Sequence, residues 1–87
     1  MIKKLEVGKY YRYDNTQYKM DEPGHGSNYA PSCVFKVIKV ESFDDRYEFR
    51  YIEVGKNYSR SWGSSKEFAH KYFKELSEEE AVFEMIQ

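Results

Sequence analysis

The chain has 87 residues, 14 Lys and Arg against 15 Asp and Glu, and a single cysteine, Cys33. A chain this short is expected to form one domain over residues 1–87, and a lone cysteine excludes an internal disulfide and fits a reducing, cytoplasmic compartment. No stretch approaches about 18 consecutive apolar residues, and there is no charged-then-apolar leader, so we expect no membrane partner.

The tetrapeptide Glu-Val-Gly-Lys occurs twice, at residues 6–9 and 53–56. The first copy lies in Leu5–Tyr13, whose alternating pattern predicts a strand with a bend at Gly8. The second copy predicts a two-residue type II′ hairpin turn at Gly55–Lys56, because glycine readily adopts a positive φ. We interpret both copies as turn chemistry rather than as a duplicated functional motif.

Residues 14–32 follow the first predicted strand and include Pro23, Gly24, Gly26 and Pro31. No helical or strand period runs through them, so the sequence predicts a long loop. Loops of this length are uncommon in compact domains and are often functional.

Further strands are expected in a β-rich body that spans residues 5–62. Cys33–Ser42 is rich in β-branched residues, and its apolar residues change face after Val37, which predicts either two covered faces or a β-bulge. Residues 46–54 alternate tyrosine or phenylalanine with charged residues and form a hairpin with Cys33–Ser42 through a turn at 43–45. Residues 57–62 are expected to return as a short strand.

The pattern becomes helical in residues 64–87. Ser64-x-x-Glu67 and Ser77-x-x-Glu80 have the spacing of capping boxes, which predicts helices near Ser65–Phe73 and Glu78–Ile86. The second helix has an apolar stripe made of Val82, Phe83, Met85 and Ile86. Residues 74–76 are also compatible with a short last strand.

These elements predict an α+β fold, a small, strongly bent antiparallel sheet of four or five strands with C-terminal helical segments. Three parts of the sequence carry a resemblance to a known family: LEVGKYYRY, VFKVIKV with YEFRYIEV, and FAHKYFKEL. They resemble small SH3-like β-barrel proteins of the kind often encoded by bacteriophages and mobile elements. The resemblance implies an SH3-like partial barrel and ligand binding through the loop after the first strand, which corresponds to residues 14–32. It carries over no individual site residue.

The residues that could support catalysis are few. The chain has two histidines, His25 and His70, and one thiol, and no pair of ligands has the spacing typical of a metal site. The Gly24–Ser27 segment lacks the lysine and the context of a phosphate-binding loop. We therefore predict that the protein is not an enzyme and needs no metal or cofactor.

Aromatic residues are abundant, with nine Tyr, six Phe and one Trp. A core of this size is not expected to hide all of them, and aromatic residues are enriched in binding hot spots. We therefore predict a non-enzymatic protein-interaction module, such as a phage-encoded inhibitor of a host or defence protein. The expected protein-binding residues, in the loop and next to it, are Tyr18, Met20, His25, Tyr29 and Trp62.

An alternative is a small barrel that binds single-stranded nucleic acid through a basic and aromatic face of the sheet. Its expected contact residues are Arg12, Lys36, Arg46, Arg50, Tyr58 and Arg60. Bases stack on aromatic rings while cations neutralise phosphates. The same alternation also arises when a strand places its rings inside and its charges outside, and a sequence isoelectric point of about 6.1 is low for a nucleic-acid-binding domain.

Overall fold

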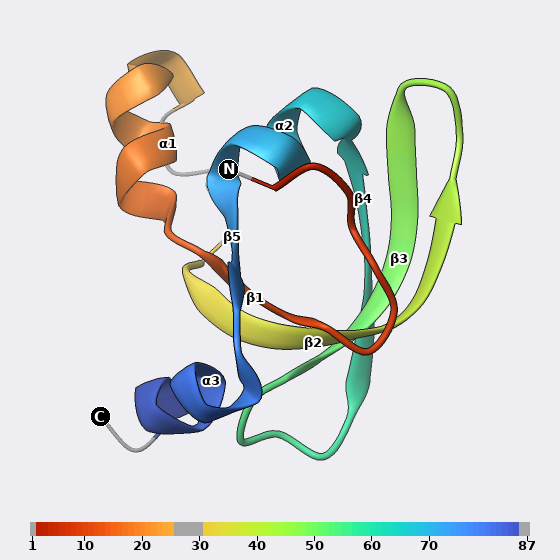
Figure 1. Cartoon of the computed structure of the whole chain (residues 1–87). Helices are drawn as coiled ribbons and strands as arrows, with labels where there is room; N and C mark the ends of the chain where they lie inside the picture. Colours follow the sequence, from red (N-terminus) through yellow and green to blue (C-terminus); the bar gives the residue numbers. More distant parts are fainter. Residues whose placement is uncertain (1, 26–30, 86–87) are drawn as a thin grey trace.

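The computed structural model describes residues 2–25 and 31–85, without the side chains of His25 and Met85 (Figure 1). The elements in chain order are β1 (Tyr10–Tyr13), α1 (Asn15–Asp21), the 3-10 helix η1 (Pro23–His25), β2 (Cys33–Ser42), β3 (Arg46–Glu53), β4 (Ser59–Ser65), α2 (Lys66–Tyr72), β5 (Phe73–Leu76) and α3 (Glu78–Met85).

The five strands form one antiparallel sheet in the order β4-β3-β2-β1-β5. The first four strands follow one another as a meander, and β5 returns to pair with the free side of β1. The sheet curves strongly, as Figure 1 shows, and ends at β4 and β5, so it is not closed into a barrel. The predicted α+β class and bent antiparallel sheet are therefore confirmed, and the last strand predicted as an option at residues 74–76 is present as β5.

A bulge in β2 explains why its apolar residues change face. The pairing with β3 shifts between Val37 and Lys39. Phe35 and Val37 are buried before this point, and the half-buried Val40 lies beyond it. Because one extra residue moves the following side chains to the other face, the bulge keeps apolar contacts on the core side along the strand.

Both Glu-Val-Gly-Lys segments form turns with glycine at positive φ, at 86° for Gly8 and 91° for Gly55. The predicted type II′ geometry is nevertheless wrong. The Lys56 N–H donates to the Glu53 carbonyl at 3.0 Å, which makes Gly55 the third residue of a four-residue turn, and β4 begins only at Ser59. A positive φ at that position is typical of a type II turn.

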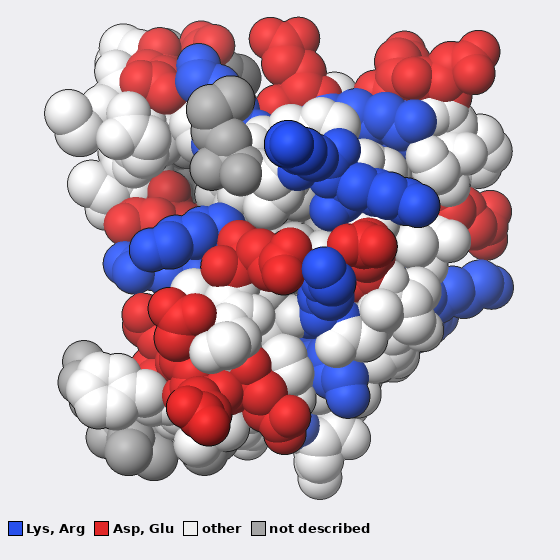
Figure 2. Space-filling model, viewed as in Figure 1, with Lys and Arg blue, Asp and Glu red and all other residues white. Residues whose placement is uncertain are grey.

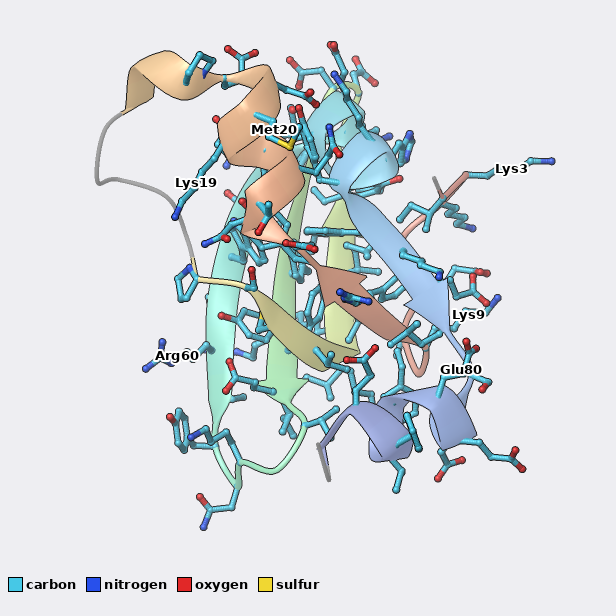
Figure 3. All side chains as sticks on the ribbon, turned by 90° about the vertical axis from the view of Figure 1, so that its left-hand side faces the viewer. Lys3, Lys9, Lys19, Met20, Arg60 and Glu80 are labelled. Carbon is cyan, nitrogen blue, oxygen red and sulfur yellow. The ribbon has the colours of Figure 1, made fainter. Side chains whose placement is uncertain are left out.

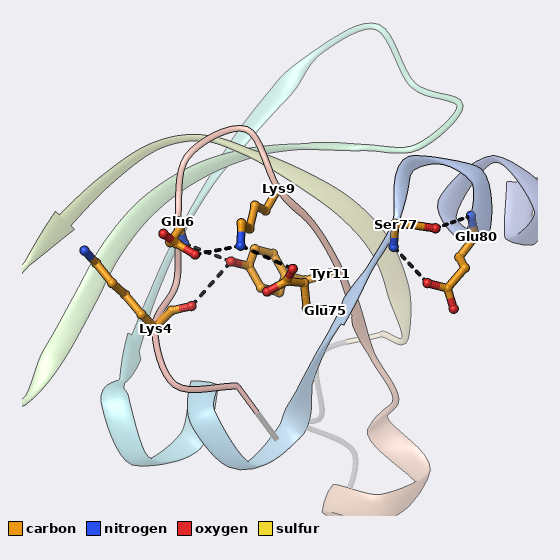
Figure 4. Close-up of polar contacts among 7 residues, drawn as sticks. All are labelled: Lys4, Glu6, Lys9, Tyr11, Glu75, Ser77 and Glu80. Atoms are coloured by element: carbon orange, nitrogen blue, oxygen red, sulfur yellow. Dashed lines mark hydrogen bonds and ion pairs between the residues drawn. The ribbon is translucent and has the colours of Figure 1, made fainter.

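The first turn makes β1 shorter than predicted, because the strand begins at Tyr10 rather than at Leu5. The buried Tyr11 hydroxyl ties the turn to the strand: it accepts from the Glu6 N–H at 2.9 Å and donates to the Lys4 carbonyl at 3.4 Å (Figure 4). Lys9 also pairs with Glu6 at 2.9 Å. The tyrosine ring fills the core while its hydroxyl satisfies backbone groups of the turn.

The prediction that residues 14–32 form an irregular loop is wrong for its first part, which contains α1 and η1. Asp14 caps α1 by accepting the Thr16 N–H at 2.9 Å. The far end of the segment returns to the helix start, where the Asn15 N–H donates to Ser32 Oγ at 2.9 Å. The helix has only seven residues, and a helix so short shows little apolar periodicity in its sequence.

The core is mainly aromatic. Its largest fully buried side chains are Tyr11, Tyr13, Phe35, Val37, Phe73 and Leu5. Among the tyrosines of the described residues, only Tyr58 is exposed, at 48%. The core therefore does not hide every aromatic ring, as predicted, but the described residues contain no group of exposed tyrosines that could form a docking surface.

The two predicted C-terminal helices are present as α2 and α3. Ser65, not Ser64, caps α2 by accepting the Phe68 N–H at 3.0 Å, so the predicted capping residue is wrong by one position. The predicted box of α3 is complete: Glu80 N–H donates to Ser77 Oγ at 3.1 Å, and Ser77 N–H donates to Glu80 Oε1 at 2.9 Å (Figure 4).

Candidate interaction surface

The helix α3 lies against β1, β2 and β5, on the face of the sheet opposite the aromatic core. Tyr11 and Tyr13 of β1 point into the core, so Arg12 between them points to the other face, where its guanidinium contacts Glu84 at 3.4 Å. Ala81, a residue of α3, is fully buried. A small residue at this contact lets α3 pack closely on the sheet and fixes which helix face is turned outward.

The outward face of α3 carries two exposed apolar side chains. Val82 is 45% exposed and Phe83 is 59% exposed. Among the large hydrophobic residues exposed in the described ranges, they are the only two that are neighbours in sequence. An exposed aliphatic and aromatic pair on one rigid helix is a suitable anchor for a partner surface.

Phe83 stands between two hollows. The first is lined by Ser77, Glu78, Glu79, Val82 and Phe83. The second is lined by Arg12, Lys74, Leu76, Glu79, Glu80, Phe83 and Glu84. A partner that occupies either hollow can therefore contact the Phe83 side chain.

The helix segment that carries this apolar pair is acidic, although Arg12 and Lys74 line the second hollow. Residues 77–85 include four glutamates and no Lys, Arg or His. Figure 2 shows acidic side chains gathered at the lower left, where Figure 1 places α3. The hydrogen bond from the Ser77 backbone lowers the pKa of Glu80, so this carboxylate is ionised at neutral pH. We call Glu78, Glu79, Val82 and Phe83 the α3 patch.

Two residues predicted to bind protein, Tyr18 and Trp62, are half-buried and pack against rings within the fold. The Tyr18 ring meets the rings of Phe68 and Tyr72 edge-on, each with centroids 5.1 Å apart. Trp62 is half-buried, and its ring centroid lies 5.2 Å from that of Phe73. Both side chains contact Phe68, so the structure brings them together as packing residues.

The other predicted protein-binding residues are distributed differently. Met20 on α1 is 72% exposed and points outward in Figure 3. The His25 side chain and Tyr29 lie outside the described residues. Within the described part of segment 14–32, Met20 thus offers an apolar contact, well separated in sequence from the α3 patch.

Polar contacts attach α1 to α2. The Tyr72 hydroxyl donates to Asp21 Oδ2 at 2.8 Å, and Lys71 Nζ lies 3.5 Å from the same oxygen. The hydrogen bond from Tyr72 lowers the pKa of Asp21. These contacts hold the helix in place while Tyr18 supplies its apolar contact.

The residues predicted to bind nucleic acid lie on several strands and mostly have partners. Arg12 lies 3.5 Å from Asp14 and 3.4 Å from Glu84, Arg46 pairs with Glu48, and Arg50 donates to Ser59 at 3.0 Å. Lys36 lies over the Tyr10 ring. Acidic partners lower the positive potential that phosphate binding requires.

One part of that predicted face does combine a ring with cations. The Arg60 guanidinium lies 5.6 Å from the centroid of the exposed Tyr58 ring. Glu53, Lys56, Tyr58 and Arg60 line a hollow at the turn between β3 and β4. Figure 3 shows Arg60 projecting away from the sheet.

Two residues considered for catalysis, Cys33 and His70, have surroundings in the fold that explain them without a reaction. Burial raises the pKa of the Cys33 thiol to about 11, which keeps it protonated at neutral pH. His70 Nε2 lies 2.6 Å from the Tyr47 hydroxyl. Within residues 2–25 and 31–85, no group of three or more His, Cys, Asp and Glu is placed to hold a metal ion.

The apolar stripe of α3 is visible in the sequence, but the sequence does not show which of its residues face outward. A signal was available in Ala81, a small apolar residue that suits close packing on the sheet. Val82 and Phe83 follow it at about 100° and 200° around the helix, so they point away from that contact.

No protein-family model matches this sequence, and the searches of curated proteins and solved structures also found no significant match. None of the helices in the described part of the chain has the length and apolar character needed to cross a membrane.

Proposed function

We propose that the protein is a non-enzymatic protein-interaction module that binds its partner through the α3 patch. The observation that carries the proposal is the exposure of Val82 and Phe83 on a helix whose opposite face is anchored to the sheet. Burying such a side chain fully is worth about 1.5–3 kcal/mol relative to leaving it exposed. Two neighbouring anchors can therefore contribute substantially to an interface.

The local structure of α3 supports this role, because it limits the cost of binding. The capping box fixes the first turn, and the contact between Arg12 and Glu84 ties the second turn to β1. A contact surface that is already ordered loses little conformational freedom when a partner binds.

The segment 14–32 is a second, smaller part of the proposal. Met20 is available there for contact, whereas Tyr18 and Trp62 are engaged in packing. We therefore assign the main contact to α3 rather than to this segment.

The finer form of the proposal is a cytoplasmic, SH3-like partial barrel that a phage encodes to inhibit a host or defence protein. The strand order, with β5 paired to β1 and a short helix between β4 and β5, supports the fold resemblance. The identity of the partner as a host or defence protein rests on the sequence resemblance alone.

A pull-down with matched variants tests the proposal. Phe83→Ser removes the proposed anchor, and Phe43→Ser removes another exposed ring, 49% exposed, in the turn between β2 and β3 that lies far from α3 in Figure 1. The proposal expects a protein partner retained by the unmodified chain and by Phe43→Ser, and lost with Phe83→Ser. A partner retained equally by both variants would contradict the assignment to α3.

The second candidate function is binding of single-stranded nucleic acid, and the contact between Tyr58 and Arg60 favours it. Base stacking on a ring is worth about 1–3 kcal/mol, and the neighbouring cations can contact phosphate. A titration with single-stranded DNA and RNA at two salt concentrations tests it. This candidate requires binding that weakens steeply with salt and is reduced by Tyr58→Ala, and absence of binding at low salt would eliminate it.

A further inference from the structure

Building on the proposed function, we propose that the partner presents a basic amphipathic segment to α3. Its apolar side chains would cover Val82 and Phe83, and its Lys or Arg side chains would pair with Glu78 and Glu79.

The charge of the patch is the first argument. Glu78 and Glu79 are exposed, and neither forms an ion pair with any described residue. Two cations line the second hollow: Arg12 contacts Asp14 and Glu84, and Lys74 lies near enough to Glu80 to help lower the pKa of that carboxyl. The patch therefore has negative charge to offer to a partner, and complementary charges increase the rate and specificity of association.

The same charge disfavours other occupants. In a two-fold dimer formed through α3, each helix would face its own copy, and the glutamates of both would approach one another. Like charges that face each other across an interface oppose association. Phosphate groups of a nucleic acid or of an anionic membrane would be repelled for the same reason. A cationic protein segment is the occupant that this surface fits.

The shape of the patch is the second argument. An α-helix of eight residues is roughly 12 Å long at 1.5 Å per residue, so α3 presents about two turns. Phe83 and Glu79 both line each of the two hollows, so an apolar and an acidic side chain are offered to an occupant of either one. An amphipathic helix can place apolar side chains into such hollows and charged side chains at their rims.

Synthetic amphipathic helices test this chemistry directly. One peptide combines Leu with Lys, and its matched counterpart carries Glu at every Lys position. Each is titrated into the isotopically labelled full chain while amide chemical shifts are followed by NMR. We expect the Leu-Lys peptide to shift the amides of residues 77–85 before other amides, and the Leu-Glu peptide to leave them unchanged.

Charge-matched variants separate a specific contact from general attraction. Glu78→Gln with Glu79→Gln is expected to weaken binding of the Leu-Lys peptide at least tenfold. The control is Asp44→Asn with Asp45→Asn, which changes the net charge by the same amount in the exposed turn between β2 and β3. Its affinity is expected to remain within about twofold of the unmodified chain.

The outcomes distinguish this inference from the proposed function. Equal binding of both peptides, lost in Phe83→Ser, would overturn the basic partner while supporting an apolar docking surface. Equal weakening by the two charge variants, or failure of the Leu-Lys peptide to shift residues 77–85, would also overturn the inference. The proposed function itself depends on the separate pull-down with Phe83→Ser.

Discussion

The helices α2 and α3 start alike but turn their aromatic side chains in opposite directions. Each begins after a capping serine, Ser65 or Ser77, and they have seven and eight residues. In α2, Phe68 packs against the rings of Tyr13 and Trp62. In α3, Phe83 is 59% exposed.

Whether a ring is exposed therefore depends on its position in the fold rather than on a shortage of space in the core. The core accepts Tyr11, Tyr13 and Phe73 completely. Phe83 lies two positions after the fully buried Ala81, about 200° around the helix, and so points away from the buried side of α3. The aromatic residues of α2 stabilise the fold, whereas that of α3 is available for binding.

The largest expected effect lies where α2 joins the core. Phe73 caps the C-terminal end of α2 and is 1% exposed. Phe73→Ala is expected to lower the free energy of unfolding by about 3–5 kcal/mol, the usual cost of removing a buried phenyl group. Urea denaturation measures this change. A cost below about 1 kcal/mol would contradict the conclusion that the aromatic residues at α2 stabilise the fold.

The two serine caps provide a comparison in which the helices should behave alike. Ser65→Ala and Ser77→Ala each remove the side-chain acceptor of an N-terminal N–H, and each is expected to cost about 1 kcal/mol. Thermal denaturation compares the variants with the unmodified chain. Ser64→Ala is the matched control, because the Ser64 hydroxyl is buried without a hydrogen-bond partner among the described residues. A larger loss in Ser64→Ala than in Ser65→Ala would contradict the assigned cap.

A smaller effect is expected when the attachment of α1 to α2 is weakened, and it should be confined to α1. Tyr72→Phe removes the hydroxyl that donates to Asp21 but keeps the ring that packs against Tyr18. We expect faster hydrogen exchange in the amides of α1 and unchanged exchange in those of α3. Similar acceleration in both helices would show that the hydroxyl supports the whole fold rather than the attachment of α1.

The capping box of α3 also predicts a pH dependence. The pKa of Glu80 is lowered from its ordinary value of 4.5 by the hydrogen bond from the Ser77 backbone. The folded state thus favours the ionised carboxylate. The box therefore stabilises α3 at pH values above the ordinary pKa of the carboxyl, and this stabilisation is lost as the pH falls through the lowered pKa. NMR shifts of the Ser77 amide follow the transition. An unchanged transition in Glu80→Gln would assign it to another group.

The sequence predicts the features that depend on a few neighbouring residues. The box at Ser77 and Glu80 and the positive φ of Gly55 follow from local patterns, whereas the local pattern after Val37 left a bulge and two covered faces as alternatives. The cap at Ser65 was harder to identify, because Ser64 precedes it and has a glutamate at the expected spacing.

Features that depend on contacts between distant segments could not be predicted in this way. The helix α1 is held by Tyr18 against Phe68, which lies 50 positions further along the chain. The exposure of Phe83 depends on the pairing of β1 with β5, which positions α3. No periodic pattern within either helix contains this information.

The most direct test of the account is the free energy of unfolding of Phe83→Ser, measured by urea denaturation. If Phe83 is reserved for binding, the value should remain within about 0.5 kcal/mol of that of the unmodified chain, as is usual for surface substitutions. A loss of about 2 kcal/mol or more would show that Phe83 stabilises the fold, and would contradict its role as a free docking residue.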